Sequence, residues 1–187
     1  ARTLPPPAPA NHEWAVHASK PLVGDEVLNL SFAVAPRNLD LLEQLAANMS
    51  TPGHPSRGNF LSYDEAHALV ANRAATNRVE AWLLGEPGVS IVDTHPHGRY
   101  IHATATVAVW ARMLATRFAH HLPAEDGPQR RRLSEGDAEE TMLCATEPIH
   151  VASHVVEHLS GVHGAACPLA NRLRPMLKLE DEPVGSD

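Results

Sequence analysis

The clearest pattern in the chain is a change of hydrophobic period within residues 27–49. Residues 27–35 alternate, with Leu28, Leu30, Phe32 and Val34 on one face and Asn29, Ser31 and Ala33 on the other. This period of two predicts a half-buried strand. After Asn38, a candidate helix cap, apolar residues recur at helical spacing: Leu39, Leu42, Leu45, Ala46 and Met49. The pattern therefore predicts a strand followed directly by a helix.

Two further helices and a hairpin are predicted in the middle of the chain. Ser62 and Glu65 have the spacing of a capping box, which predicts a short helix through Val70. Asn77 is expected to begin the next helix, which residues 85–88 stop, with Val79, Trp82 and Leu83 facing inward. Short strands at 89–93 and 99–104 flank the turn residues 95–98 and predict a hairpin.

The last elements complete a β-α-β-β-α-β order. We expect a long helix from Thr106 to Phe118, a fourth strand at 142–146 and a short helix at 153–160. Residues 12–16 are expected to form an edge segment. This order predicts an α+β fold, with a ferredoxin-like antiparallel sheet, helices mainly on one face, and extended tails.

The remaining segments have no periodic apolar face. Residues 1–11 are rich in proline and predict a leader, residues 12–163 the domain itself, and residues 164–187 a linker. Within the domain, residues 120–138 are polar, contain Pro and Gly, and predict a flexible insertion. Beyond Gly161 we expect an irregular tail.

Composition excludes some classes of protein. The chain has 187 residues, 43% of them hydrophobic, and a formal charge of -7. Such a composition is typical of one globular domain with tails. The acidic balance argues against a nucleic-acid-binding surface. The short basic run 130–132 is interpreted as a solvated loop, with a protease cleavage site as the alternative. No apolar run approaches the roughly 18 residues that a membrane span requires.

Thirteen histidines are the compositional anomaly. Their unperturbed pKa of about 6.5 lies between neutral and endosomal or vacuolar pH. Protonating all of them would move the formal charge from -7 to +6 at most. The chain is therefore a candidate pH sensor, and the sensing candidates are His95, His97, His102, His120, His121, His150, His154 and His158. The alternative is that the histidines are simply scattered on the surface, and His95, His97, His120 and His121 read as solvated loop and helix-end residues.

Motifs for catalysis are absent and those for metal binding are weak. No G-x-S-x-G is present, and the spacing His154, His158 on a predicted helix is not H-E-x-x-H, although the pair could face one metal ion. Cys144 and Cys167 permit one disulfide, with free thiols or a thiol nucleophile as alternatives. Asn29 and Asn48 begin N-glycosylation triplets. We expect no catalytic residue and no cofactor in this chain.

An ordered set of segments resembles the activation propeptide of the sedolisin family, the serine-carboxyl peptidases that include kumamolisin and tripeptidyl peptidase I. The segments are residues 28–34 (LNLSFAV), 38–45, 51–52, 55–62 (PSRGNFLS), 79–83 (VEAWL), 88–89, 105–118 and 155–162 (VVEHLSGV). The resemblance covers about residues 12–163. Two positions depart from the family pattern: Arg57 stands in place of an aromatic residue, and Ala152 in place of a proline.

The resemblance implies a function without catalysis by this chain. A peptidase domain with glutamate, aspartate and serine catalytic residues has no counterpart here. We expect an intramolecular chaperone and pH-released inhibitor of a cognate sedolisin-type peptidase, in the secretory pathway, outside the cell or in a lysosome or vacuole. Residues 164–187 would lie across the peptidase cleft. The alternative is a free-standing ferredoxin-like binding module, metal-loaded through His154 and His158.

Overall fold

The computed structural model of the chain describes residues 14–16, 20–123 and 141–167. Their helices are α1 (Leu39–Ser50), α2 (Tyr63–Val70), α3 (Arg73–Leu84), α4 (Val107–Met113) and α5 (Ser153–Val156). Their strands are β1 (Trp14–Val16), β2 (Val27–Val34), β3 (Ser90–Thr94), β4 (Tyr100–Thr106), β5 (Phe118–Pro123), β6 (Met142–Ala145) and β7 (Leu159–His163). The predicted leader and most of the predicted insertion and linker lie outside the described residues.

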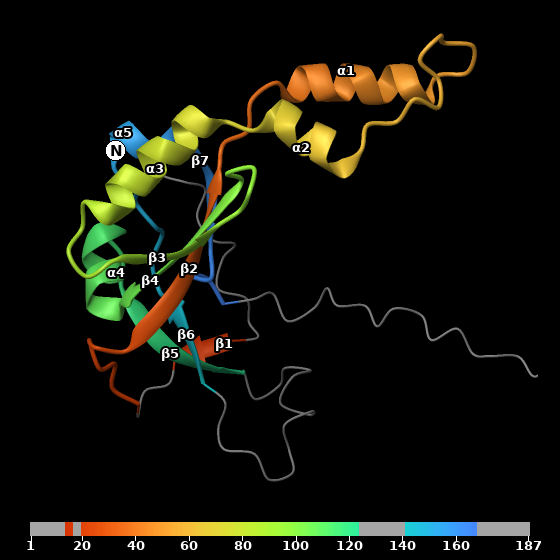
Figure 1. Cartoon of the computed structure of the whole chain (residues 1–187). Helices are drawn as coiled ribbons and strands as arrows, with labels where there is room; N and C mark the ends of the chain where they lie inside the picture. The colour runs from red at the N-terminus through yellow and green to blue at the C-terminus, as the bar shows by residue number, and fades with distance from the viewer. Residues whose placement is uncertain (1–13, 17–19, 124–140, 168–187) are drawn as a thin grey trace, which may run out of the picture.

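A four-stranded antiparallel sheet in the order β3-β4-β2-β7 forms the centre of the domain. With α1 to α3 between β2 and β3, and α4 between β4 and β7, it is the predicted ferredoxin-like arrangement. Helices α3, α4 and α5 cover one face of the sheet (Figure 1). The α+β prediction is therefore confirmed.

The core lies between this sheet and the covering helices. The alternation predicted for β2 places Leu30, Phe32 and Val34 in it, each 2% exposed or less. Phe32 packs against Trp110 of α4 and Trp82 of α3, with ring centroids 5.6 Å and 5.8 Å apart. The Trp110 indole N–H donates to the Leu28 carbonyl at 2.8 Å, so this fully buried ring leaves no polar atom unsatisfied.

A second, three-stranded sheet in the order β1-β5-β6 was not predicted. The expected long helix ends at Met113, because Ala115 adopts a left-handed φ of 43°. The Thr116 N–H then bonds the Ala111 carbonyl and the Ala115 N–H the Arg112 carbonyl, which is the Schellman pattern of a helix end. Phe118, expected on the helix, instead begins β5 and joins the core.

The C-terminal prediction was also wrong in part. The strand at 142–145 exists, but it pairs with β5 in the second sheet. The fourth strand of the central sheet is β7, in the stretch expected to be a helix end and tail, since α5 ends at Val156 and Leu159 begins the strand. The fading apolar pattern misled because β7 includes Ser160 and Gly161 and is only partly buried.

Helices α1 and α2 extend away from the sheet (Figure 1). The Ser62–Glu65 capping box is formed as predicted. Of the apolar stripe predicted for α1 only Met49 is buried, and Leu39 is exposed, because α1 packs chiefly on α2. Helix α3 begins at Arg73, before the expected Asn77, because the Asn72 side chain caps it by accepting from the Ala75 N–H at 3.2 Å.

Candidate functional site

The face of the central sheet opposite the core carries polar and titratable side chains. On β4, Tyr100 and His102 alternate with the buried Ile101 and Ala103 and so point away from the core. Ser31 of β2 lies opposite His102 on one side and His163 of β7 on the other. The Ser31 hydroxyl is 2.7 Å from His102 Nδ1. Two histidines from different strands therefore lie on either side of one serine on this open face.

At one end of this face, three histidines from two elements form a cluster. His67 lies on α2, and His95 and His97 lie on the β3–β4 turn. The ring centroids of His67 are 5.5 Å from those of both His95 and His97, which are 5.7 Å from each other. We call these three residues the histidine cluster.

Aromatic rings connect the cluster to its surroundings. The Tyr63 ring lies 4.1 Å from His67, and the Tyr100 ring lies 6.4 Å from His95 and 6.4 Å from His163. A series of neighbouring rings thus runs from α2 across the turn to β7. Sequence reasoning selected His95, His97 and His102 but missed His67 and His163, because nothing local marks a histidine on α2 as a neighbour of the turn.

Burial and neighbouring charges favour the neutral imidazole of one member of the cluster, His95. The pKa of His95 is lowered, first by burial and then by repulsion from His67, His97 and Arg99, while Asp93 opposes the shift. His67 Nδ1 is buried and has no hydrogen-bond partner among the described residues. His97 has an opposing influence, since its Nε2 lies 3.3 Å from the Asp64 carboxylate. The cluster therefore contains one histidine, His95, whose neutral form is favoured, and another, His97, that lies beside a carboxylate.

His120 and His121 are not solvated, contrary to expectation. They lie on β5 and are 5% and 7% exposed, because the helix expected to end there is replaced by a strand between two others. His120 Nε2 is 3.0 Å from the Glu26 carboxylate, and this hydrogen bond is the main cause of the lowered pKa of Glu26. Glu26 was not among the predicted site residues, since 94 positions separate it from His120.

The other predicted histidines do not join a cluster. The α5 helix expected to carry both His154 and His158 ends at Val156, so the two residues do not lie on one helix face. His154 is exposed, and His158 Nε2 lies 3.5 Å from the Glu157 carboxylate. His150 is half-buried, and its backbone N–H donates to the Leu114 carbonyl at 2.8 Å.

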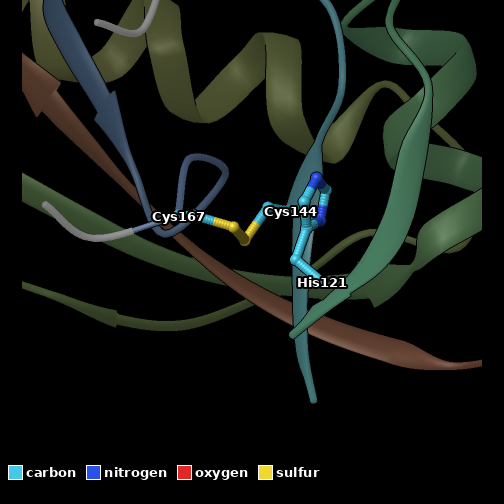
Figure 2. A group of neighbouring side chains, drawn as sticks. All are labelled: His121, Cys144 and Cys167. Carbon is cyan, nitrogen blue, oxygen red and sulfur yellow. A yellow bond between two sulfur atoms is a disulfide. The ribbon is translucent and has the colours of Figure 1, made fainter. Parts of the chain in front are cut away.

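Cys144 and Cys167 form a disulfide, with their Cα atoms 5.3 Å apart. His121 lies beside it (Figure 2). Among the described residues, these three form the only group of His, Cys, Asp or Glu whose potential ligand atoms all lie within 4.8 Å of one another. Both sulfur atoms are used by the disulfide, so the group has no thiolate for a metal.

The Ser31–His102 contact lacks the surroundings of a nucleophile. Both residues lie on central strands, whose backbone N–H groups bond neighbouring strands on both sides. Donors for an oxyanion are therefore already used in the sheet. The pair is better explained as part of a titratable surface than as a catalytic site.

Comparison with known proteins gives a consistent picture. The family model described as "Pro-kumamolisin, activation domain" matches residues 15–166. "Probable tripeptidyl-peptidase SED3" of Arthroderma benhamiae is 34% identical over 128 residues, covering 67% of this chain and 21% of that protein. "Tripeptidyl-peptidase 1" of Rattus norvegicus is 27% identical over 141 residues, covering 75% and 23%. The chain thus spans about a fifth of the length of these relatives.

Proposed function

The chain belongs to the pro-kumamolisin activation domain family, the propeptides of the sedolisin peptidases, and we propose that it acts as chaperone and pH-released inhibitor of a cognate peptidase domain. The main support for this proposal is that the family model of the activation domain matches residues 15–166. In addition, the chain covers only about a fifth of the length of its tripeptidyl-peptidase relatives. The partner is then a domain corresponding to the rest of such a relative, and this chain supplies no catalytic group.

The chaperone role is supported by a domain that has its own core and one uncovered sheet face. The core includes residues of both sheets, among them Phe32 of β2 and Phe118 of β5. The open face, with Ser31, Tyr100, His102 and His163, offers a preformed surface on which a partner could complete its own packing. A stable module of this kind lowers the folding barrier of a neighbour because its side of the interface is already ordered.

The inhibitory role is proposed to end on acidification. Histidines at an interface with the peptidase would gain positive charge as the pH falls, and a desolvated charge without a partner weakens the complex. The linker predicted from residue 164 begins later than expected, because Ala165 is fully buried in the core and Cys167 is disulfide-bonded to Cys144. Residues 168–187, which lie outside the described residues, are proposed to cross the cleft of the peptidase as a substrate-like linker. The same proposal places the protein in the secretory pathway, outside the cell or in an acidic lysosome or vacuole. No helix in the described part of the chain is long and apolar enough to cross a bilayer.

The proposal predicts a pH-dependent inhibition constant. The chain is added in trans to its cognate peptidase domain, and residual activity on a tripeptide-releasing substrate is measured at pH 7 and pH 5. We expect at least tenfold weaker inhibition at pH 5, because a pKa difference of one unit corresponds to about a factor of ten. Equal inhibition at both values would remove the pH-released role, and absence of inhibition at both would remove the inhibitor role.

A further inference from the structure

The β3–β4 turn that carries His95 and His97 is held firmly on helix α3. Gly98 adopts a φ of 69°, and a Cβ at this position would lie 2.4 Å from Thr76 Oγ1. The buried Thr76 hydroxyl donates to the Gly98 carbonyl at 3.0 Å, and the Arg73 guanidinium donates to the Pro96 carbonyl. The turn therefore has little freedom to move relative to α3.

Helix α2, on the other side of the cluster, is held differently at its two ends. At its C-terminal end, the Val70 carbonyl accepts from the Arg37 N–H at 3.1 Å, and Val70 is buried. Nearer its start, the ring and polar side-chain contacts with the turn involve His67 and Asp64. Since α1 and α2 together extend from the sheet (Figure 1), these contacts brace an arm whose base is fixed.

The charges around the cluster decide what acidification does. Besides the three imidazoles, Arg73 and Arg99 contribute positive charge, and Asp64 and Asp93 negative charge. The rings of Tyr63 and Tyr100 also border the cluster. A third carboxylate, Glu80 of α3, accepts from the Thr94 hydroxyl at 2.9 Å. Once the three imidazoles are protonated, these three carboxylates face five cations, which leaves a net repulsion across rings that lie less than 6 Å apart.

We propose that His67, His95 and His97 form an acid-sensitive latch, which holds α2 on the β3–β4 turn while the imidazoles are neutral and releases it when they are protonated. Separating α2 from the turn relieves both the repulsion and the desolvation, so the open arm binds protons more readily. The closed arrangement is therefore most favoured above the ordinary histidine pKa and is lost as the pH falls below it. The inference rests on the proposed function only in taking acidification as the activating signal.

Hydrogen exchange of the full chain tests the latch. Amide exchange is measured at pH 7.5 and 5.0, corrected for the intrinsic effect of pH, with residues 73–84 of α3 as the internal reference. We expect protection of residues 63–70 to fall at least tenfold at pH 5.0 relative to that reference, since each unit of lowered pKa corresponds to about a factor of ten. The triple variant His67→Gln, His95→Asn, His97→Gln, which cannot gain these charges, should keep its protection at both pH values.

A matched control and a second measurement keep the test decisive. His154→Gln removes an exposed histidine of α5 and should behave as wild type. If the triple variant does not fold, an NMR titration of the wild-type chain replaces it, in which the α2 amide shifts should follow the cluster ring protons. Any one of three results would overturn the latch. The first is that the folded triple variant loses amide protection of α2 at pH 5.0, and the second is that this protection does not change with pH in the wild type. The third is that the α2 amide shifts do not follow the titration of the cluster rings.

The inhibition assay separates the latch from the function on which it rests. If inhibition still weakens at pH 5 while α2 stays protected, the propeptide function stands and the latch is wrong. If α2 opens at pH 5 but inhibition is equal at both pH values, the latch stands and pH release of the inhibitor is wrong.

Discussion

Individual titratable residues in this domain owe their behaviour to neighbours that are distant in sequence. His120 and Glu26 are hydrogen-bonded although 94 positions separate them in the sequence, and only 5% of the histidine is exposed. His67 meets the turn histidines although α2 and the turn are separated by the whole of α3. The chemistry of each group is therefore set by packing and not by its sequence context.

Glu26→Gln should destabilise the domain at neutral pH by about 1 kcal/mol, because it replaces a charged acceptor of the buried His120 by a neutral one. The pKa of Glu26 is lowered, so the carboxylate stabilises the fold above its ordinary pKa and loses this effect as the pH falls below it. In urea denaturation, the free energy of unfolding of the variant should therefore be lower than that of the wild type at pH 7, and this difference should shrink near pH 4. Asp25→Asn, at the exposed neighbouring position, is the control, and a constant difference at both pH values would contradict the assignment.

At the scale of elements, the ends of helices decide the topology. Ala115 in a left-handed conformation ends α4 early enough for Phe118 to begin a strand, and a second sheet forms where a longer helix was expected. Likewise α5 ends at Val156 and leaves Leu159 free to pair with Val34. Helix ends of this kind depend on one residue each, so they carry little periodic signal.

Ala115→Gly should stabilise the domain by about 0.5 kcal/mol, because glycine adopts a positive φ without the steric penalty of a Cβ, which exceeds its cost in unfolded-state entropy. The matched control is Ala111→Gly within α4, where the same change should destabilise by about 1 kcal/mol. The free energy of unfolding in urea measures both. Equal destabilisation by the two substitutions would show that the left-handed position is not strained.

At the scale of the whole molecule, the two sheets share one core and one covalent link. Phe118 of β5 belongs to the same buried cluster as Phe32 of β2 and Val151, which lies in neither sheet. The Cys144–Cys167 disulfide ties β6 of the second sheet to the segment after β7 of the central sheet. The domain is therefore expected to unfold as one cooperative unit.

Cys144→Ser with Cys167→Ser should lower the free energy of unfolding by about 3 kcal/mol, the value expected for a closed loop of 23 residues. Tryptophan fluorescence and far-ultraviolet circular dichroism should still report coincident transitions in urea, because the shared core remains. A thiol reductant should reproduce the loss in wild type and have no effect on the double variant. Wild-type stability that does not change on reduction would contradict this role of the disulfide.

The candidate site was predictable only in part. Abundant histidine predicted a pH-responsive surface, which stays a prediction, and the hairpin turn placed His95 and His97 close together. The third member, His67, the Ser31–His102–His163 row and the burial of His120 could not be derived, because each depends on contacts between elements. The candidate metal-binding pair, His154 and His158, was predicted on one helix, but that helix ends at Val156.

The sequence by itself determined the elements whose signals are local: the alternating strand β2, the capped helix α2 and the β3–β4 hairpin. It also determined the α+β class, since the order of these elements leaves few arrangements. Only the tertiary structure decided the second sheet, the identity of the fourth central strand and the grouping of the histidines. The physical reason is that hydrogen bonds within a helix or hairpin join nearby residues, whereas sheet neighbours and side-chain clusters are chosen by burial across the whole chain.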